Sequence, residues 1–598
     1  MELSTDLFQT ILSPTAAYAS SLEWEEDVIN SEPSIPTSLS PSTPLTNLSW
    51  HLPGIDADGT RIFAIPNFAL NSPPLRIDVL LPSPNTYPLT LRRTLRSGSA
   101  MLKLNKQEIQ DLPLSRHILS ALQRWSSQNE GFEKKYMELP FGSQIIIENI
   151  DADVKEMWIH LVPVYDVEGM WLSVEELKKM WDSEAELQRS WPETLDFSEL
   201  KFQETISEAV SVVRMDATLK NTTGKREQMF IFKSAIRDTK YMYHELHNLL
   251  FTPPHPHLIP RPPYLITKTT RFGGKKGVCG FLLPYYPHGT LQKALSSPTS
   301  SLDLTTRLRW AQEIVSTIVH ISSPPMQYYP DIKPDNIMLV PDAHEKDKLS
   351  TILIDLEQRG GWFSWSAPEI AYIEYIEHLA THAPTSSLKS HFTTLLRQYI
   401  PTWKPLRTTD KYVPTSQGFS TAWNVLTPAE REAAHVFMIG KLLWCIFENV
   451  GSICDGPFAE MLRADLEPSI RFPEFRNTPE GLRGLIMRCT AGAREWADPG
   501  RRNLVLVWEG KLIVTQESRV ELGENDVNAE EIVRCSAKEA QVAAKQWWVE
   551  EVKHAEEFLE AKIRRGEGGS GGEEQHPLFR KIEERPSLVE VLRVLQEL

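Results

Sequence analysis

The chain has 598 residues, more than one compact core usually holds, so its length predicts two or three domains. Its formal net charge of -16 opposes unspecific attraction to nucleic acid and to anionic membranes, and we expect neither among its partners. Five scattered cysteines without a CxxC pair disfavour a zinc site or a disulfide framework. Together with an acidic rather than basic first thirty residues, they favour an intracellular protein, cytoplasmic with the nucleus not excluded.

The first part of the chain reads as a linker followed by a small accessory region. Residues 1–50 are expected to be largely disordered, since 31–49 are rich in Ser, Pro and Thr. Residues 51–196 read as an accessory α+β region, with short apolar runs typical of strands and a helix over about 114–126. A capping box formed by Ser173 and Glu176 predicts an amphipathic helix that ends this region.

Strand patterns come first in residues 197–598, and helix patterns dominate later. A helix over 239–250 follows the predicted strands. Another helix begins near residue 303, and Thr427 caps a third that is apolar on nearly all sides and so belongs at the centre of a core. Residues 529–565 predict a long charged helix.

Two apolar runs, 337–340 and 351–354, flank a polar stretch and predict a β-hairpin. Because the turn of a hairpin joins one pair of strand ends, the opposite ends also lie together. Asn336 and Asp355 stand at those ends. One amide oxygen and one carboxylate therefore converge, which suits Mg²⁺ held against phosphates.

The residues just before the hairpin add two further polar groups. Asp331 can face the same site as a proton acceptor, and Lys333 can supply positive charge. The competing interpretation is that these are solvated turn residues, because Asp and Asn favour turns regardless of function. The combined D-x-K-P-x-N spacing, hairpin and terminal Asp favour a functional site.

This segment resembles the eukaryotic protein-kinase superfamily, in particular the divergent kinase-domain proteins of filamentous fungi, over roughly residues 197–598. The family pattern H-R-D-x-K-P-x-N is matched except that Tyr329 and Pro330 replace its His and Arg. Asp355 matches the metal-binding Asp of D-F-G, with Leu356 and Glu357 in place of Phe and Gly.

The resemblance implies an α+β, bilobal protein-kinase-like fold behind the accessory region. It places a β-rich N-lobe at about 197–290 and a helical C-lobe at about 291–598, with insertions at about 371–426 and 495–580. It also implies ATP and Mg²⁺ as cofactors. Glu369, in an Ala-Pro-Glu triplet that matches A-P-E, would form a structural ion pair with Arg585.

Upstream, the same resemblance implies an ATP-binding set. Lys233 follows a strand that resembles V-A-I-K and would contact the α- and β-phosphates, and Glu245 would hold it as an ion pair. Pro284 and Tyr286 resemble the hinge that receives adenine, where Pro284 need offer only a carbonyl and Tyr286 keeps the required N–H. A surface lysine, a solvated glutamate and a plain strand ending at a proline turn are the alternatives.

Three departures bear on activity. The stretch 204–212, where the family has its glycine-rich phosphate loop, contains no glycine, and Glu204 and Glu208 would add unfavourable charge if they pointed inward. Pro330 and the short segment between Asp355 and Glu369 argue against activation by loop phosphorylation. His435 stands where the family usually keeps an Asp, and we expect a buried, hydrogen-bonded core histidine there.

The sequence therefore predicts an ATP- and Mg²⁺-dependent phosphotransferase, a serine/threonine protein kinase by resemblance, with a small-molecule kinase as a variant. The alternative is a pseudokinase scaffold that binds nucleotide or protein partners and transfers little or no phosphate. Neither the substrate, the protein partner nor the oligomeric state follows from the sequence.

Overall fold

The computed structural model describes most of the chain with gaps. The described residues are 13–19, 49–55, 60–69, 77–83, 86–88, 91, 95, 112–181, 191–206, 209–215, 228–234, 238–297, 302–342, 345, 348–361, 364–406, 410–415, 417–453, 458–460, 470, 472–497, 505–508, 511–515, 532–534, 537–566 and 576–598. The linker expected at 31–49 lies almost entirely outside them. None of the helices in these ranges is long and apolar enough to cross a membrane.

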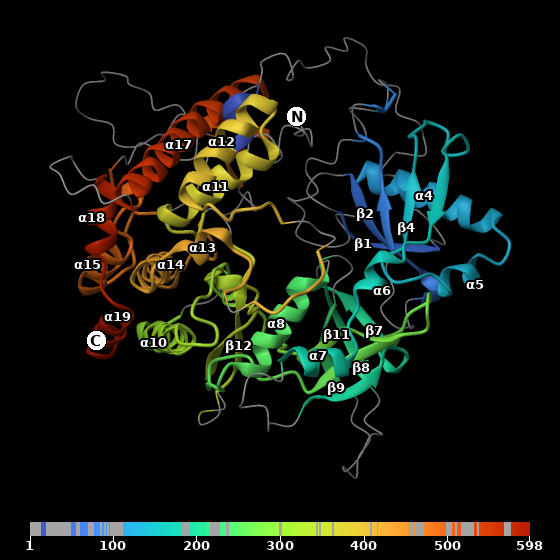
Figure 1. The fold of residues 1–598 in the computed structure, drawn as a ribbon, viewed down its shortest axis with the longest axis horizontal. Coiled ribbons are helices and arrows are strands. Elements are labelled where there is room, and N and C mark those ends of the chain that lie inside the picture. Colours follow the sequence, from blue (N-terminus) through green and yellow to red (C-terminus); the bar gives the residue numbers. More distant parts are fainter. Residues whose placement is uncertain are drawn as a thin grey trace.

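A five-stranded sheet with its own core forms the accessory region (Figure 1). Its strands are β1 (Trp50–Ile55), β2 (Arg61–Pro66), β3 (Ile77–Leu80), β4 (Gln144–Ile147) and β5 (Ile159–Val162), in that order. Strands β3 and β4 are parallel and the other neighbours antiparallel. The predicted helix is present as α4 (Pro113–Gln128), and α5 (Phe132–Met137) follows it. Tyr136 and Ile118 are fully buried against the sheet.

A second sheet of six strands has the order β6-β10-β11-β9-β8-β7. Its strands are β6 (Glu193–Asp196), β7 (Lys201–Thr205), β8 (Val210–Met215), β9 (Gln228–Ser234), β10 (Tyr264–Thr269) and β11 (Lys276–Pro284). Strand β6 pairs in parallel with β10, and the remaining neighbours are antiparallel. Helix α8 (Thr239–Phe251) lies between this sheet and the helical part of the molecule (Figure 1).

The sheet begins before the boundary expected at residue 197. Strand β6 belongs to it by hydrogen bonding, and Trp171, which follows α6 (Asp166–Met170), packs in its core. The capping box of Ser173 and Glu176 is present and opens α7 (Val174–Trp181). This helix does not close the accessory region, because Leu177 and Trp181 are buried in the large core shared with α8.

The helical part is built around α14 (Pro428–Glu448), whose capping box of Thr427 and Glu430 forms as predicted. The helices around it are α9 (Leu291–Leu295), α10 (Leu304–Ile321), α11 (Pro368–His382), α12 (Ser386–Tyr399), α13 (Thr421–Val425), α15 (Glu480–Cys489), α16 (Arg494–Ala497), α17 (Ala537–Gly566), α18 (Pro577–Glu583) and α19 (Leu588–Gln596). The hairpin of β12 (Ile337–Pro341) and β13 (Leu349–Leu353) faces α10. The chain is thus an α+β protein with a strand-rich part and a helical part.

Two features of this part differ from the sequence predictions. Residues 532–534 form strand β17, so the long charged helix begins at Ala537 rather than near 529. This strand joins β14 (Phe458–Glu460), β15 (Val505–Trp508) and β16 (Lys511–Thr515) in a small sheet that the sequence did not predict.

The N-terminal segment is the other difference, since part of the region expected to be disordered is ordered. Residues 14–18 form a 3₁₀ helix that lies beside α12 and α17, far along the chain (Figure 1). Ser13 caps it and contacts His378 of α11, with 2.9 Å between Oγ and Nε2. Ala16 and Ala17 are buried there, because small side chains fit closely against the helices.

Candidate active site

The predicted hairpin is confirmed and brings two of the predicted residues together along the backbone. Strand β12 pairs antiparallel with β13, with Ile337 opposite Leu353. The N–H of Ile354 donates to the carbonyl of Asn336 over 3.0 Å, so the chain reaches Asp355 directly beside Asn336. The two side chains have different hydrogen-bond partners, described below, and do not bond to each other.

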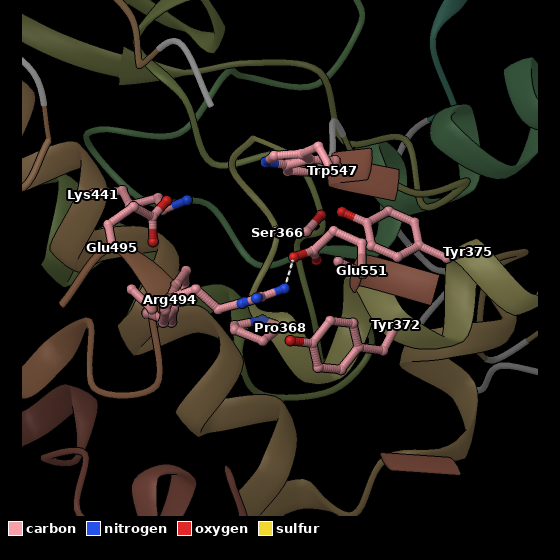
Figure 2. A pocket seen from close by; sticks show the side chains of 12 residues that line it. Ser366, Pro368, Tyr372, Tyr375, Lys441, Arg494, Glu495, Trp547 and Glu551 are labelled. Carbon is pink, nitrogen blue, oxygen red and sulfur yellow. Dashed lines mark hydrogen bonds and ion pairs between the residues drawn. The ribbon is translucent and has the colours of Figure 1, made fainter. Parts of the chain in front are cut away.

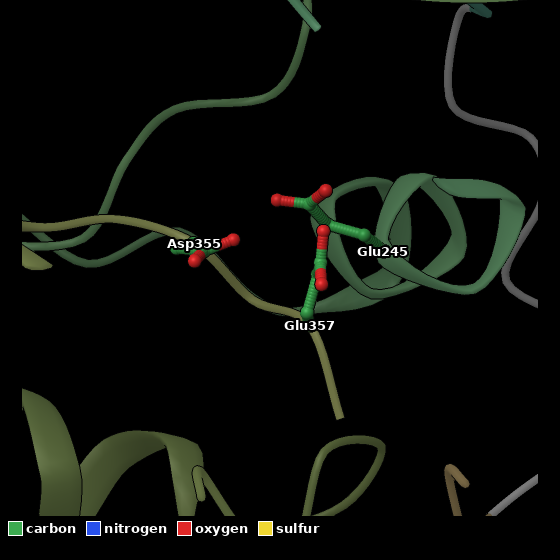
Figure 3. Close-up of side chains that lie close together, drawn as sticks. All are labelled: Glu245, Asp355 and Glu357. Atoms are coloured by element: carbon green, nitrogen blue, oxygen red, sulfur yellow. The ribbon is translucent and has the colours of Figure 1, made fainter. Parts of the chain in front are cut away.

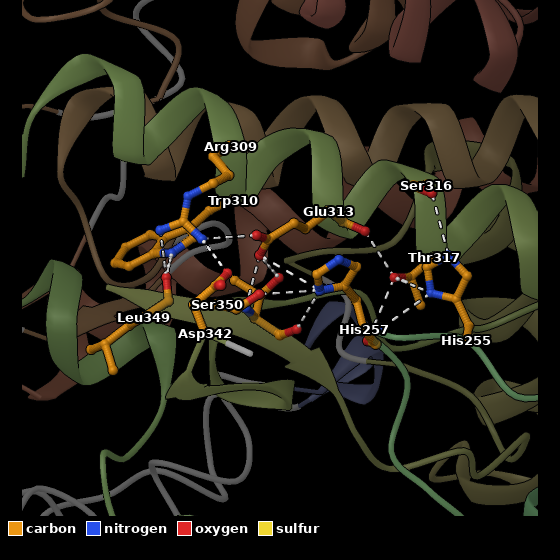
Figure 4. A network of polar contacts seen from close by, with 11 residues as sticks. His255, His257, Arg309, Trp310, Glu313, Ser316, Thr317, Asp342, Leu349 and Ser350 are labelled. Carbon is orange, nitrogen blue, oxygen red and sulfur yellow. Dashed lines mark hydrogen bonds and ion pairs between the residues drawn. The ribbon is translucent and has the colours of Figure 1, made fainter. Parts of the chain in front are cut away.

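Helix α10 fixes the hairpin from its far side (Figure 4). The carboxylate of Glu313 accepts hydrogen bonds from both N–H and Oγ1 of Thr351, each 2.8 Å long. Arg309 donates to the carbonyl of Leu349 over 2.7 Å and pairs with Glu313 over 3.0 Å. Because Glu313 is buried and also pairs with Arg309, these bonds hold β13 in one register.

Asp331 lies at the centre of a small polar group in the loop before β12. Its Oδ2 accepts from the side-chain amide of Asn336 and from the ammonium of Lys333, each over 2.9 Å. Its Oδ1 is buried without a hydrogen-bond partner among the described residues. Burial raises the pKa of this carboxyl, although Lys333 acts in the opposite direction. An oriented carboxylate with one oxygen free can accept a proton.

The loop that carries Asp331 is supported from the core. The N–H of Tyr329 donates to Nε2 of His435 over 2.9 Å, and its phenol donates to the carbonyl of Ile354 over 2.8 Å. His435 is fully buried in α14, and burial lowers its pKa to about 3. The ring is therefore neutral and can accept from the loop. The expectation of a hydrogen-bonded core histidine is confirmed.

Lys233, at the end of β9, is surrounded by three carboxylates. Its ammonium lies 2.7 Å from Glu245 of α8, 2.6 Å from Asp355 and 3.1 Å from Glu357. The predicted ion pair of Lys233 with Glu245 is thus present, and Asp355 meets it from the hairpin side. One oxygen from each acid lies within 4.8 Å of the others, close enough to hold a metal ion (Figure 3).

The backbone at Asp355 is unusual in a way that directs its side chain. Asp355 has φ of 64°, a left-handed conformation that costs energy for a residue other than glycine. This conformation ends the line of β13 and turns the carboxylate toward Lys233. Backbone strain of this kind is typical of functional sites.

The charged groups in this cluster shift one another's pKa values. Burial opposes the charge of Lys233, but Asp355, Glu245 and Glu357 outweigh it and hold the pKa of the ammonium well above its usual value. Burial, helped by the two other acids, raises the pKa of Glu245 to about 8 despite Lys233. Asp355 is partly exposed, and Lys233 overcomes its burial and lowers its pKa. Glu245 therefore keeps its proton at neutral pH, and its carboxyl adds no negative charge to the cluster.

The predicted hinge residues lie on the strand next to Lys233. Phe281 of β11 pairs with Lys233, and β11 ends at Pro284, opposite Phe230. Tyr286 follows and is partly buried, and burial raises its pKa to about 12. Because the two strands are antiparallel, Pro284 lies near the start of β9, three residues along the strand from Lys233.

The hairpin of β7 and β8 borders Lys233 on the other side, because Val210 pairs with Lys233. The N–H of Ile206 donates to the carbonyl of Val210 over 2.9 Å and closes the hairpin. Glu204 is exposed, and Glu208 lies outside the described residues. Side chains rather than glycines thus cover this edge, which limits how closely the backbone can approach a phosphate.

Glu369 and Arg585 form the predicted ion pair away from the cluster. The guanidinium bonds both carboxylate oxygens, at 2.5 and 3.1 Å, and both side chains are fully buried. The pair ties the start of α11 to the segment before α19, so its role is structural.

The sequence analysis missed two contributors. Glu357 was read as a departure from D-F-G, but it contacts both Lys233 and Arg359, the latter over 2.8 Å. Gln358 donates to the carbonyls of Met326 and Tyr328, each over 2.7 Å, and accepts from His244 of α8 over 2.8 Å. No spacing rule marks these positions, since their partners come from distant segments.

A cavity of about 50 Å³ lies between α11, α14, α16 and α17 (Figure 2). Trp547 forms one wall, and Arg494 pairs with Glu551 across it. Trp547 and Trp548 are both buried, so the aromatic residues of the 495–580 insertion act as packing elements there. None of the predicted site residues lines this cavity.

Comparison with models of known protein families finds no match to this chain, and comparison with curated proteins finds no similar sequence.

Proposed function

We propose that this chain is an ATP- and Mg²⁺-dependent phosphotransferase of the protein-kinase superfamily that acts on an alcohol group, with a bilobal fold whose lobes meet at the Lys233 cluster. The observation that carries the proposal is the contact of Lys233 with both Glu245 and Asp355, beside the loop that holds Asp331 and Asn336. Three segments far apart in sequence supply the cation, the hard oxygen ligands and the proton acceptor that such a transfer needs.

The residues fit a magnesium nucleotide by the chemistry of their donors. Asp355 offers a carboxylate and Asn336 an amide oxygen, the ligand types that Mg²⁺ prefers. Asp355, whose pKa is lowered by Lys233, would hold the metal, and Lys233 would bind phosphate oxygens. Bound MgATP supplies the transferable γ-phosphoryl group.

In the transfer, a bond forms between the acceptor oxygen and the γ-phosphorus while the bond from that phosphorus to the β,γ-bridging oxygen breaks. Asp331 takes the hydroxyl proton on its free Oδ1. Lys333, held 2.9 Å from Asp331, stabilises negative charge on the transferred group. ADP is the leaving group.

A pseudokinase scaffold is the second candidate. Two observations favour it: the β7–β8 hairpin has no glycine over 204–212, and three carboxylates already surround Lys233. A scaffold of this kind would bind nucleotide or a protein partner without turnover.

Labelled ATP with generic protein and small-molecule acceptors tests the first candidate. Loss of a general base typically costs about 10²–10⁴-fold in rate, so Asp331→Asn should label acceptors at least 100-fold more slowly than wild type. Asp335→Asn is the matched control, because that carboxylate is more exposed and lies farther from Lys333, at 3.5 Å. Equal labelling by wild type and Asp331→Asn would remove Asp331 from the mechanism. Nucleotide binding without labelling of any acceptor would favour the scaffold.

A further inference from the structure

Two carboxylates flank a pair of consecutive glycines next to the Asp331 loop. A Cβ added at Gly361 would lie 3.6 Å from Oδ1 of Asp331, and one added at Gly360 would lie 3.4 Å from Oε1 of Glu374. Both Oδ1 of Asp331 and Oε2 of Glu374 are buried without a hydrogen-bond partner among the described residues. Two distant segments thus bring two carboxylates, each with one unpaired oxygen, to one short stretch of backbone.

The glycines explain why no side chain covers these oxygens. Gly360 has φ of 128°, which side-chain-bearing residues rarely adopt, and a Cβ at Gly361 would lie 2.3 Å from the carbonyl oxygen of Pro330. The backbone therefore runs directly against the Asp331 loop.

Glu374 has no structural task that accounts for it. One turn later on α11, Glu377 accepts hydrogen bonds from Trp403 over 2.7 Å and from Thr421 over 2.6 Å, as a structural acid does. Oε2 of Glu374 accepts none from the described residues. Burial raises the pKa of Glu374 to about 8, with Glu377 and Asp331 adding to the shift. An unpaired buried carboxylate is costly, and perturbed groups of this kind concentrate at functional sites.

We propose that Glu374 binds a positively charged group, an ammonium or a guanidinium, on the molecule whose hydroxyl Asp331 receives. This inference rests on the proposed phosphotransfer and deepens it by naming the class of acceptor. A cation beside the reacting hydroxyl favours the charged form of Glu374 and satisfies its unpaired Oε2, whereas an uncharged or anionic acceptor offers no such pairing. The cation can belong to a basic peptide or to a small amino alcohol.

Equilibrium binding tests the proposal without requiring turnover. The probes are three seven-residue peptides with a central serine flanked by arginine, glutamine or glutamate, together with ethanolamine and its uncharged counterpart ethylene glycol. Wild type should bind the cationic probes at least about tenfold more tightly than the uncharged ones. A preference for the arginine peptide alone identifies a peptide acceptor, and a preference for ethanolamine alone identifies a small amino alcohol.

The variants assign the preference to one side chain. Glu374→Gln keeps the shape and should abolish the preference, whereas Glu374→Asp keeps the charge and should retain part of it. Glu560→Gln is the control, because it removes the same charge from an exposed position on α17. Absence of a preference in wild type, or an unchanged preference in a folded Glu374→Gln, overturns the inference.

The two proposals fail in different ways. If the preference depends on Glu374 but wild type transfers no labelled phosphate, phosphotransfer fails and the cation site stands. If wild type transfers phosphate equally to cationic and uncharged acceptors, the cation site fails and phosphotransfer stands.

Discussion

Breaking the buried pair of Glu369 and Arg585 should destabilise the helical part strongly. Both side chains are fully buried, two bonds join them, and the guanidinium also donates to the carbonyls of Ala491 over 2.9 Å and Ala433 over 3.1 Å. Glu369→Gln removes the negative charge and leaves a buried cation uncompensated. Removing one partner of such a pair typically costs about 3–5 kcal/mol, and we expect a loss in this range.

Urea denaturation followed by tryptophan fluorescence measures this loss, and several tryptophans are buried in the same core. The control is Glu597→Gln, which breaks the pair of Glu597 with Arg593; its atoms are 2.6 Å apart, but both side chains are about 60 % exposed. Exposed pairs contribute about 0–1 kcal/mol, so the control should lose little. Similar losses in the two variants, both below about 1 kcal/mol, would refute the reasoning from burial.

Three further predictions concern the site. His435 stays neutral in the fold because its pKa is lowered to about 3, whereas the unfolded chain binds a proton on this ring below about pH 6.5. Wild type should therefore lose up to about 1.4 kcal/mol of stability per pH unit from this group as the pH falls below 6.5. In His435→Asn, the urea midpoint should change less with pH between 7.5 and 5 than in wild type. Gly280→Ala places a Cβ 2.4 Å from the carbonyl of Lys233, so it should lower the free energy of unfolding by about 1–3 kcal/mol and weaken MgATP binding. Gly484→Ala has open space around its Cβ and should do neither, and equal effects of the two variants would contradict the packing argument. Glu374 keeps its proton in the fold up to about pH 8, whereas the unfolded chain releases it above about 4.5, so wild type loses stability as the pH rises from about 4.5 to 8. Glu374→Gln should therefore match wild type near pH 4.5 and melt higher at pH 9, and a lower melting temperature at pH 9 would count against an unpaired acid.

Local patterns in the sequence predicted the parts of this protein that depend on local chemistry. The β12–β13 hairpin follows from two apolar runs around a polar turn. The starts of α7 and α14 follow from capping boxes, since the cap and its acid are three residues apart. The spacing around Asp331 likewise predicted that it lies beside Lys333 and Asn336.

The resemblance predicted contacts that no local pattern could, such as Lys233 with Glu245 and Glu369 with Arg585. Their catalytic roles remain predictions. Features outside the resemblance could not be predicted from the sequence. Ala16 is buried against helices that lie hundreds of residues later, and nothing in its own segment indicates that surface. Glu374 is an ordinary helical acid until Gly360 and Asp331 are placed around it.

The central claim is that Asp355 helps to hold a magnesium nucleotide beside Lys233. Isothermal titration of MgATP into wild type, Asp355→Asn and the control Asp335→Asn tests it most directly. Loss of even an outer-shell partner weakens metal binding about 10–100-fold, so Asp355→Asn should weaken MgATP binding at least tenfold while the control binds like wild type. Equal affinity in wild type and Asp355→Asn, or no binding to any of the three, would contradict the account.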